Sequence, residues 1–145
     1  MARMIDRVHA MIRGEAPNPP AADLIGFRAV EVGDGTAVFE MEAGPRHANP
    51  MGTLHGGILC DIADGAMGVA YSTALGDGES FTTLELKINF LKPVWNARLR
   101  AHARVVKRGK TVGLVECDVV DEKGSLVARA SSTCLTLSGD KAAGR

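Results

Sequence analysis

Apolar residues recur along the chain with two different periods. Apolar and polar residues alternate from Phe27 to Val32, from Thr36 to Ala43 and through most of the segment from Ser80 to Leu137, as in strands with one buried face. From Ile58 to Leu75 the apolar period lengthens to about 3.6 residues, which predicts a long helix. The expected order is therefore two strands joined at the turn Gly33-Asp34-Gly35, one apolar helix, and then strands.

The region after the helix divides into strands at its turn residues. Strands are predicted over residues 80–91, 97–107, 111–121 and 125–137. The last three are joined by tight turns at Gly109 and Gly124, so they must be antiparallel. In the first of the four, alternation places Thr83 on the polar face and Leu84 and Leu86 on the apolar face. A helix this apolar should lie across a curved antiparallel sheet that wraps it, in an α+β domain.

The two ends of the chain have different patterns. Residues 2 to about 13 show helical apolar spacing and predict a short amphipathic helix, whereas Pro17, Pro19 and Pro20 predict a rigid connection without regular structure. Residues 138–145 are small and polar, which predicts a flexible tail. We therefore expect an N-terminal helix and connection over residues 1–24, one domain over 25–137, and the tail.

Composition excludes several classes of function. The 145 residues carry 17 basic and 17 acidic side chains, so charge gives no case for nucleic acid or an anionic membrane as the main partner. No apolar run reaches the roughly 18 residues that span a bilayer, and the N-terminus lacks the apolar core of a signal peptide. The three cysteines, Cys60, Cys117 and Cys134, have no CxxC spacing, which fits reduced, buried thiols in a cytoplasmic protein.

Two carboxylates, Asp61 and Asp64, interrupt the apolar helix. Ionised groups are costly to bury and usually neutralise, pair or take part in chemistry. The same helix carries Gly65 and Gly68, and each glycine costs about 1 kcal/mol relative to alanine. Either a ligand or partner chain approaches the backbone here, or the chain packs tightly on itself.

A group of motifs in this region resembles a known family. Asn49, Gly52, His55-Gly56-Gly57, Asp64 and the strand LELKINFLKPV at 84–94 are together similar to the hotdog-fold acyl-CoA thioesterases, in the PaaI-like, phenylacetate-type branch. The resemblance covers roughly residues 25–137. It implies a hotdog fold, hydrolysis of an acyl-CoA to the free acid and CoA, and no cofactor beyond the substrate's own CoA. It also implies a homodimer joined edge to edge, often paired into a homotetramer, with active sites shared between subunits.

Thioester hydrolysis needs a base or nucleophile, an oxyanion stabiliser and a positioned water. Gly56 begins the helix, where free N–H groups and the positive end of the helix dipole could polarise a carbonyl. The resemblance implies that Asp64 is the base or nucleophile, that Asn49 positions water, that Thr83 lies near the carboxylate, and that His55 fixes the turn. Asp61 does not match the family position and is assigned a structural or helix-start role.

Each of these residues also has a purely structural interpretation. Gly56 and Gly57 could serve a tight turn, Asn49 could start one with Pro50, and Asp64 could be a buried, paired carboxylate. Thr83 could be an ordinary strand residue. For CoA, Gly57 and the hairpin cations Lys107, Arg108 and Lys110 are candidate contacts, although charged hairpin tips are often only solvated.

Other chemistries fit less well. Cys60 within an apolar helix is interpreted as inert packing, the histidines and aspartates lack compact zinc-ligand spacing, and no P-loop or GxGxxG motif occurs. No metal is therefore expected. Two other functions stay open: an acyl-thioester dehydratase or hydratase that pairs His47 or His55 with Asp64, and a non-catalytic acyl-CoA-binding protein.

Overall fold

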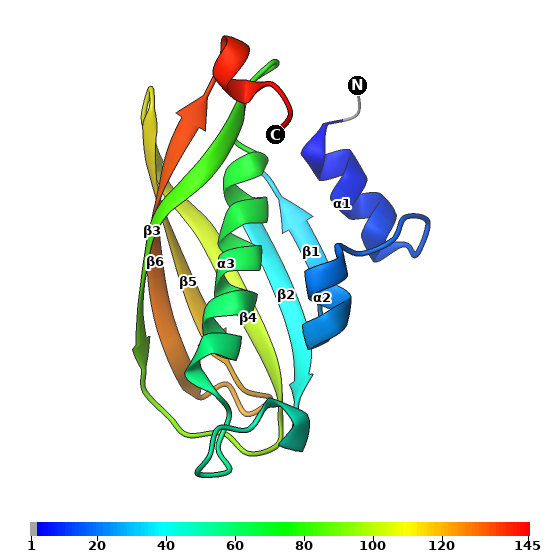
Figure 1. The fold of residues 1–145 in the computed structure, drawn as a ribbon, viewed down its shortest axis with the longest axis vertical. Coiled ribbons are helices and arrows are strands. Elements are labelled where there is room, and N and C mark those ends of the chain that lie inside the picture. Colours follow the sequence, from blue (N-terminus) through cyan, green and yellow to red (C-terminus); the bar gives the residue numbers. More distant parts are fainter. Residues whose placement is uncertain (1–2) are drawn as a thin grey trace.

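A computed structural model describes residues 3–145, and its centre is one antiparallel sheet with a helix lying across it (Figure 1). The strands are β1 (Phe27–Gly33), β2 (Thr36–Ala43), β3 (Ser80–Phe90), β4 (Ala97–Arg108), β5 (Val112–Val120) and β6 (Leu126–Leu137). Their order across the sheet is β1-β2-β4-β5-β6-β3. The helices are α1 (Met4–Ile12), α2 (Pro20–Ile25) and α3 (Gly56–Ser72), with short 3-10 turns at Pro45–His47 and Gly139–Ala142.

The long helix α3 is held by burial of one apolar face. Ile62, Ala63, Ala66 and Ala70 are completely covered by the inner face of the sheet, as the 3.6-residue pattern predicts. Tyr71 fixes the far end of the helix: its ring packs against Gly113, and its hydroxyl lies 2.7 Å from Oγ1 of Thr136. Contacts with the sheet therefore hold the helix along its length, and they fix the position of the residues on its other face.

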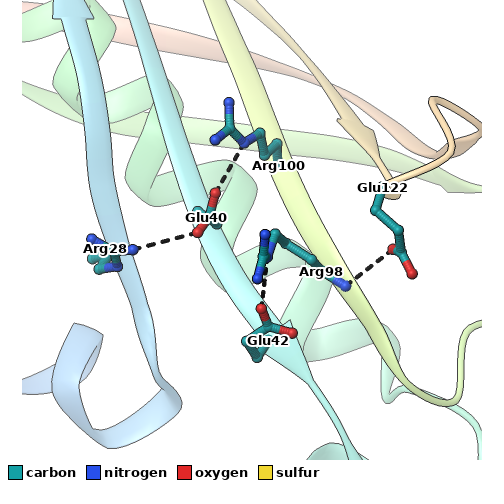
Figure 2. A network of polar contacts seen from close by, with 6 residues as sticks. All are labelled: Arg28, Glu40, Glu42, Arg98, Arg100 and Glu122. Carbon is teal, nitrogen blue, oxygen red and sulfur yellow. Dashed lines mark hydrogen bonds and ion pairs between the residues drawn. The ribbon is translucent and has the colours of Figure 1, made fainter.

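The outer face of the sheet is charged. Glu40 on β2 lies between Arg28 on β1 and Arg100 on β4, at 3.4 and 2.9 Å (Figure 2). Arg98 pairs with Glu42 at 2.7 Å in the same network (Figure 2). The arginines of these pairs are largely exposed, and surface ion pairs of this kind contribute at most about 1 kcal/mol each. The chemistry must be sought on the helix side.

Strand β3 forms one edge of the sheet and contains a bulge. Its register against β6 shifts between Thr83 and Glu85, which leaves Leu84 without a partner residue. Because of this extra residue, Thr83 pairs with the buried Cys134 and Leu86 with the buried Ser132, so both face inward, while Leu84 is 59% exposed. The sequence prediction that Thr83 lies on the polar face was therefore wrong: simple alternation cannot detect a bulge.

The N-terminal segment is more structured than its prolines suggest. The helix predicted from residue 2 onward is present as α1, and residue 2 lies outside the described residues. The prediction of an irregular connection was wrong in part, because Pro20 begins the helix α2, a position where proline needs no N–H partner. Val8 anchors α1 in the core at 2% exposure. Figure 1 shows α1 and α2 next to β1, at the edge of the sheet.

Candidate active site

The loop before α3 is fixed by two histidines. His47 is buried; its Nδ1 accepts from the N–H of Gly44 at 3.2 Å, and its Nε2 lies 2.7 Å from the carbonyl oxygen of Ile25. His55 caps the helix, with its Nδ1 accepting from the N–H of Gly57 at 2.9 Å. Both histidines thus contact backbone groups of the segments that lead into the helix.

Gly56 is the first residue of α3. Among the hydrogen bonds described for residues 3–145, none uses its N–H, which is one of the free donors at the helix start. A Cβ at this position would lie 2.7 Å from the ring of Phe90, so only glycine allows that ring its present approach. The N–H and the dipole of a 17-residue helix point toward the same space.

A pocket of about 380 Å³ opens at this helix end, and we call it the helix-start pocket. Its lining comprises Asn49, Thr53, Leu54, Gly56, Leu59 and residues 90–94. The side-chain oxygen of Asn49 accepts from the N–H groups of Met51 and Thr53, at 3.0 and 3.2 Å, and its Nδ2 donates to Oγ1 of Thr53 at 2.8 Å. In this structure Asn49 therefore acts as a turn residue, with one N–H left for the pocket.

A second hollow, the carboxylate cleft, lies between α3 and β3. It measures about 380 Å³ and is lined by Cys60, Asp61, Asp64, Thr83, Leu84, Glu85 and Leu86. The structure therefore places Thr83 beside Asp64, through the bulge described above. Cys60 is half-buried at the cleft wall rather than sealed in packing, although burial and the two aspartates raise the pKa of its thiol.

Neither aspartate of α3 is buried and paired. Both are exposed in the single chain, and no side-chain hydrogen bond or ion pair within residues 3–145 involves them. Partial burial raises the pKa of both carboxyls, and for Asp64 the nearby charge of Asp61 raises it further. Within the single chain, Asp64 is therefore not a buried, paired carboxylate. The helix-start role for Asp61 was wrong, because this residue lies beyond the first turn of α3.

A third hollow, the N-terminal cavity, separates α1 and α2 from α3. It measures about 370 Å³ and is mainly apolar. Its lining includes Met4, Val8, Met11, Phe27, Phe39, Asp64, Gly65, Gly68, Val69, Ser72 and Phe81, with Arg7, Asn18 and Arg28 among the polar members. Asp64 thus borders both this cavity and the carboxylate cleft.

The sequence did not indicate this cavity. Its signals were present, namely the apolar face of the N-terminal helix and the glycines of α3, but nothing in the pattern shows that the two face each other. The structure answers part of the question about those glycines: a Cβ at Gly65 would lie 3.1 Å from the rings of Phe27 and Phe39, so this glycine serves packing within the chain.

The predicted catalytic residues fall into two groups. Asp64 and Thr83 share the carboxylate cleft, whereas Asn49 and Gly56 share the helix-start pocket. Asp64 is eight residues after Gly56, which is about 12 Å along a helix axis. One carbonyl group cannot touch both in the same chain.

The three hairpin cations differ in burial and in their contacts with the rest of the chain. The Arg108 guanidinium is half-buried, lies 2.8 Å from Glu79 and stands 5.9 Å above the centre of the Tyr71 ring. Lys107 and Lys110 are exposed at the tip. Arg108 therefore has a structural role at the end of α3, and the prediction that the three cations bind CoA stays a prediction.

Neither a metal cluster nor a membrane span is visible in residues 3–145. No three His, Cys, Asp or Glu side chains are grouped as ligands there. None of the helices in that part of the chain is long and apolar enough to cross a bilayer.

Known proteins share this architecture and part of this sequence. A phenylacetic acid degradation-related protein from Ralstonia eutropha is 34% identical with a TM-score of 0.78, over 88% of this chain and 98% of that one. The PaaI protein of the E. coli phenylacetic acid degradation operon is 25% identical with a TM-score of 0.82, over 94% and 95% of the two chains. The 1,4-dihydroxy-2-naphthoyl-CoA hydrolase of Listeria monocytogenes is 27% identical over 111 residues, 77% of this chain and 90% of that protein.

The hotdog fold and the PaaI-like resemblance are thereby confirmed. Residues 51–128, which hold the start of α3, Asp64 and the β3 edge, match the family model described as the thioesterase superfamily. This chain belongs to the thioesterase superfamily.

Proposed function

We propose that the protein hydrolyses acyl-CoA thioesters. The observation that carries the proposal is Asp64: an unpaired carboxylate with a raised pKa, beside Thr83 in an open cleft. A base of raised pKa holds a proton more readily and suits proton abstraction from water near neutral pH. The CoA part of the substrate is supported by the related Listeria hydrolase, whose name specifies a CoA ester.

In the proposed reaction, Asp64 takes a proton from water as the water oxygen attacks the thioester carbonyl carbon. The negative charge that develops on the carbonyl oxygen is stabilised by the N–H of a Gly56. The intermediate then expels the CoA sulfur, which takes up the proton, and the free acid is left. A direct attack by Asp64, giving a mixed anhydride that water later opens, uses the same groups.

We further propose that Gly56 comes from a second copy of the chain. The separation of about 12 Å between Gly56 and Asp64 within one α3 supports this arrangement. So does β3, an edge strand with exposed Leu84 and Phe90, because an edge of this kind offers free hydrogen-bonding groups to another strand. We expect a cytoplasmic homodimer joined at β3, with pairing into a tetramer as a further step.

The hydratase alternative is less well supported. Both ring nitrogens of His47 lie at hydrogen-bonding distance from backbone groups, and Nδ1 of His55 is occupied by Gly57. Neither histidine is arranged with Asp64 in one pocket. The loop histidines therefore serve the fold, and a histidine–carboxylate pair is not formed within the described chain.

The test is a panel of acyl-CoAs, from acetyl to long-chain, benzoyl and arylacetyl, assayed for thiol release. We expect release with at least one member, and loss of that activity in Asp64→Ala but not in Asp61→Ala. Asp64→Ala should keep the melting temperature and oligomeric state of the parent. No release above a no-enzyme control would refute the hydrolase, and crotonyl-CoA hydration at a comparable rate would favour the hydratase. Thioester binding without turnover would favour a binding protein.

A further inference from the structure

The N-terminal cavity is bounded on one side by this chain's own N-terminal helices. Val8 and Met11 of α1 form one wall, and Gly65, Gly68 and Ser72 of α3 form the other. Its surface is mainly apolar carbon, whereas the neighbouring carboxylate cleft has a larger polar share and is more open to solvent. Apolar hollows lined in this way bind apolar groups in preference to water.

Asp64 stands where the two hollows meet, since it lines both. A thioester whose carbonyl carbon reaches Asp64 from the cleft has its acyl chain directed away from the cleft. The adjoining space on the other side of Asp64 is the N-terminal cavity. A carbonyl carbon held at Asp64 therefore lies at the border of the N-terminal cavity, into which the acyl chain can extend.

Gly68 gives independent support. A Cβ at Gly68 would meet only the ring of Phe81, at 3.5 Å, which is an ordinary contact. Packing within the chain therefore does not require glycine here, although glycine costs the helix about 1 kcal/mol relative to alanine. What the missing side chain provides is space in the cavity, unlike Gly65, where the Phe27 and Phe39 rings already occupy the space.

Building on the proposed function, we infer that the N-terminal cavity is the acyl-binding pocket, and that α1 and Gly68 set the size of acyl group accepted. A cavity of 370 Å³ holds about 12 groups of the size of a water molecule. The preferred substrates are therefore apolar acyl groups of roughly 8 to 12 non-hydrogen atoms, either straight chains or arylacyl groups. The mainly apolar lining favours apolar acyl groups over polar ones.

The test compares acyl preference in two variants of opposite effect. Gly68→Leu narrows the cavity and should lower the ratio of octanoyl-CoA to acetyl-CoA turnover (kcat/KM) by roughly tenfold or more. Met11→Ala widens it and should move the optimum toward longer acyl chains. His9→Ala is the matched control on α1, because His9 is exposed and does not line the cavity, and it should leave the preference as in the parent. Phenylacetyl-CoA in the same panel distinguishes aryl from straight-chain substrates.

The outcomes separate the two proposals. If the parent protein hydrolyses none of the panel, the proposed function fails. If the parent is active and Gly68→Leu and Met11→Ala are folded but keep the parent's acyl preference, the acyl pocket lies elsewhere and this inference alone fails. If Gly68→Leu does not fold, the single variants Gly68→Ala and Met11→Ala take its place, because alanine fits at position 68. Unchanged acyl preference in both of them would refute the inference.

Discussion

A single N–H group carries much of the proposed chemistry. Gly56 has its N–H free at the first position of α3, and His55 before it has extended backbone angles (φ −64°, ψ 130°). Proline is accepted at the first position of a helix and requires such an extended residue before it. The donor can therefore be deleted while the helix start is kept.

We expect Gly56→Pro to lower kcat by about 10² to 10³, the usual cost of one oxyanion donor. Gly56→Ala is the control, since it adds the same Cβ beside Phe90 but retains the N–H, and it should lose much less. Steady-state kinetics on the best substrate, with circular dichroism to confirm folding, measures both. Equal losses in the two variants would mean that the Phe90 contact matters and the donor does not.

Asp61 is predicted to control the pH profile through its charge. The pKa of Asp64 is raised by partial burial and by Asp61. The base must be ionised, so kcat/KM falls as the pH drops through that pKa, and this acid limb lies above the ordinary aspartate value of 3.8. Asp61→Asn removes the repelling charge and should move the limb to lower pH, whereas Asp61→Glu should leave it nearly in place. If the acid limb of the pH profile does not move in Asp61→Asn, the charge of Asp61 does not affect the pKa of the catalytic base.

At the scale of elements, the two glycines of α3 look alike in the sequence and differ in the structure. Gly68→Ala should raise the free energy of unfolding by about 1 kcal/mol, because alanine favours the helix and its Cβ fits. In a domain of this size that is about 3 °C in melting temperature. Gly65→Ala should gain less or lose stability, since Phe27 and Phe39 must move. Thermal unfolding of the pair measures the difference, and equal shifts would contradict the packing described.

Most elements could be predicted from the sequence, because burial of one face imposes a period on the chain. The long helix and all six strands follow from that period. The helix α3 begins at Gly56, where the motif placed its start, and it ends at Ser72 rather than at Leu75. The bulge at Leu84 and the helix at Pro20 could not be found in this way, since both depend on contacts with other segments. For the same reason Thr83 was assigned to the wrong face.

At the scale of the whole molecule, the candidate site is divided. The motif predicts that Gly56 and Asp64 act together, but in one chain the two residues lie in separate hollows. Spacing along a sequence cannot show that a residue faces another copy. The N-terminal cavity, by contrast, is formed by segments of one chain that lie far apart in the sequence.

Complementation tests the shared site directly. Asp64→Ala and Gly56→Pro should each be inactive alone. When the two variants are co-expressed, half of the dimers are mixed and each mixed dimer has one intact site, so about a quarter of the parent activity should return. If each site lies within a single chain, the mixed population stays inactive.

The bulge at Leu84 takes on a different meaning once two copies are considered. An antiparallel joint between two β3 edges has a two-fold axis, and any irregularity of the edge then occurs once on each side of it. Bulges bend a strand and increase its twist, so a continuous sheet built from both copies would be bent at two symmetric places. A deletion of this one residue would act twice in each dimer. It would straighten the joint and, at both ends of it, change the wall that stands opposite Asp64.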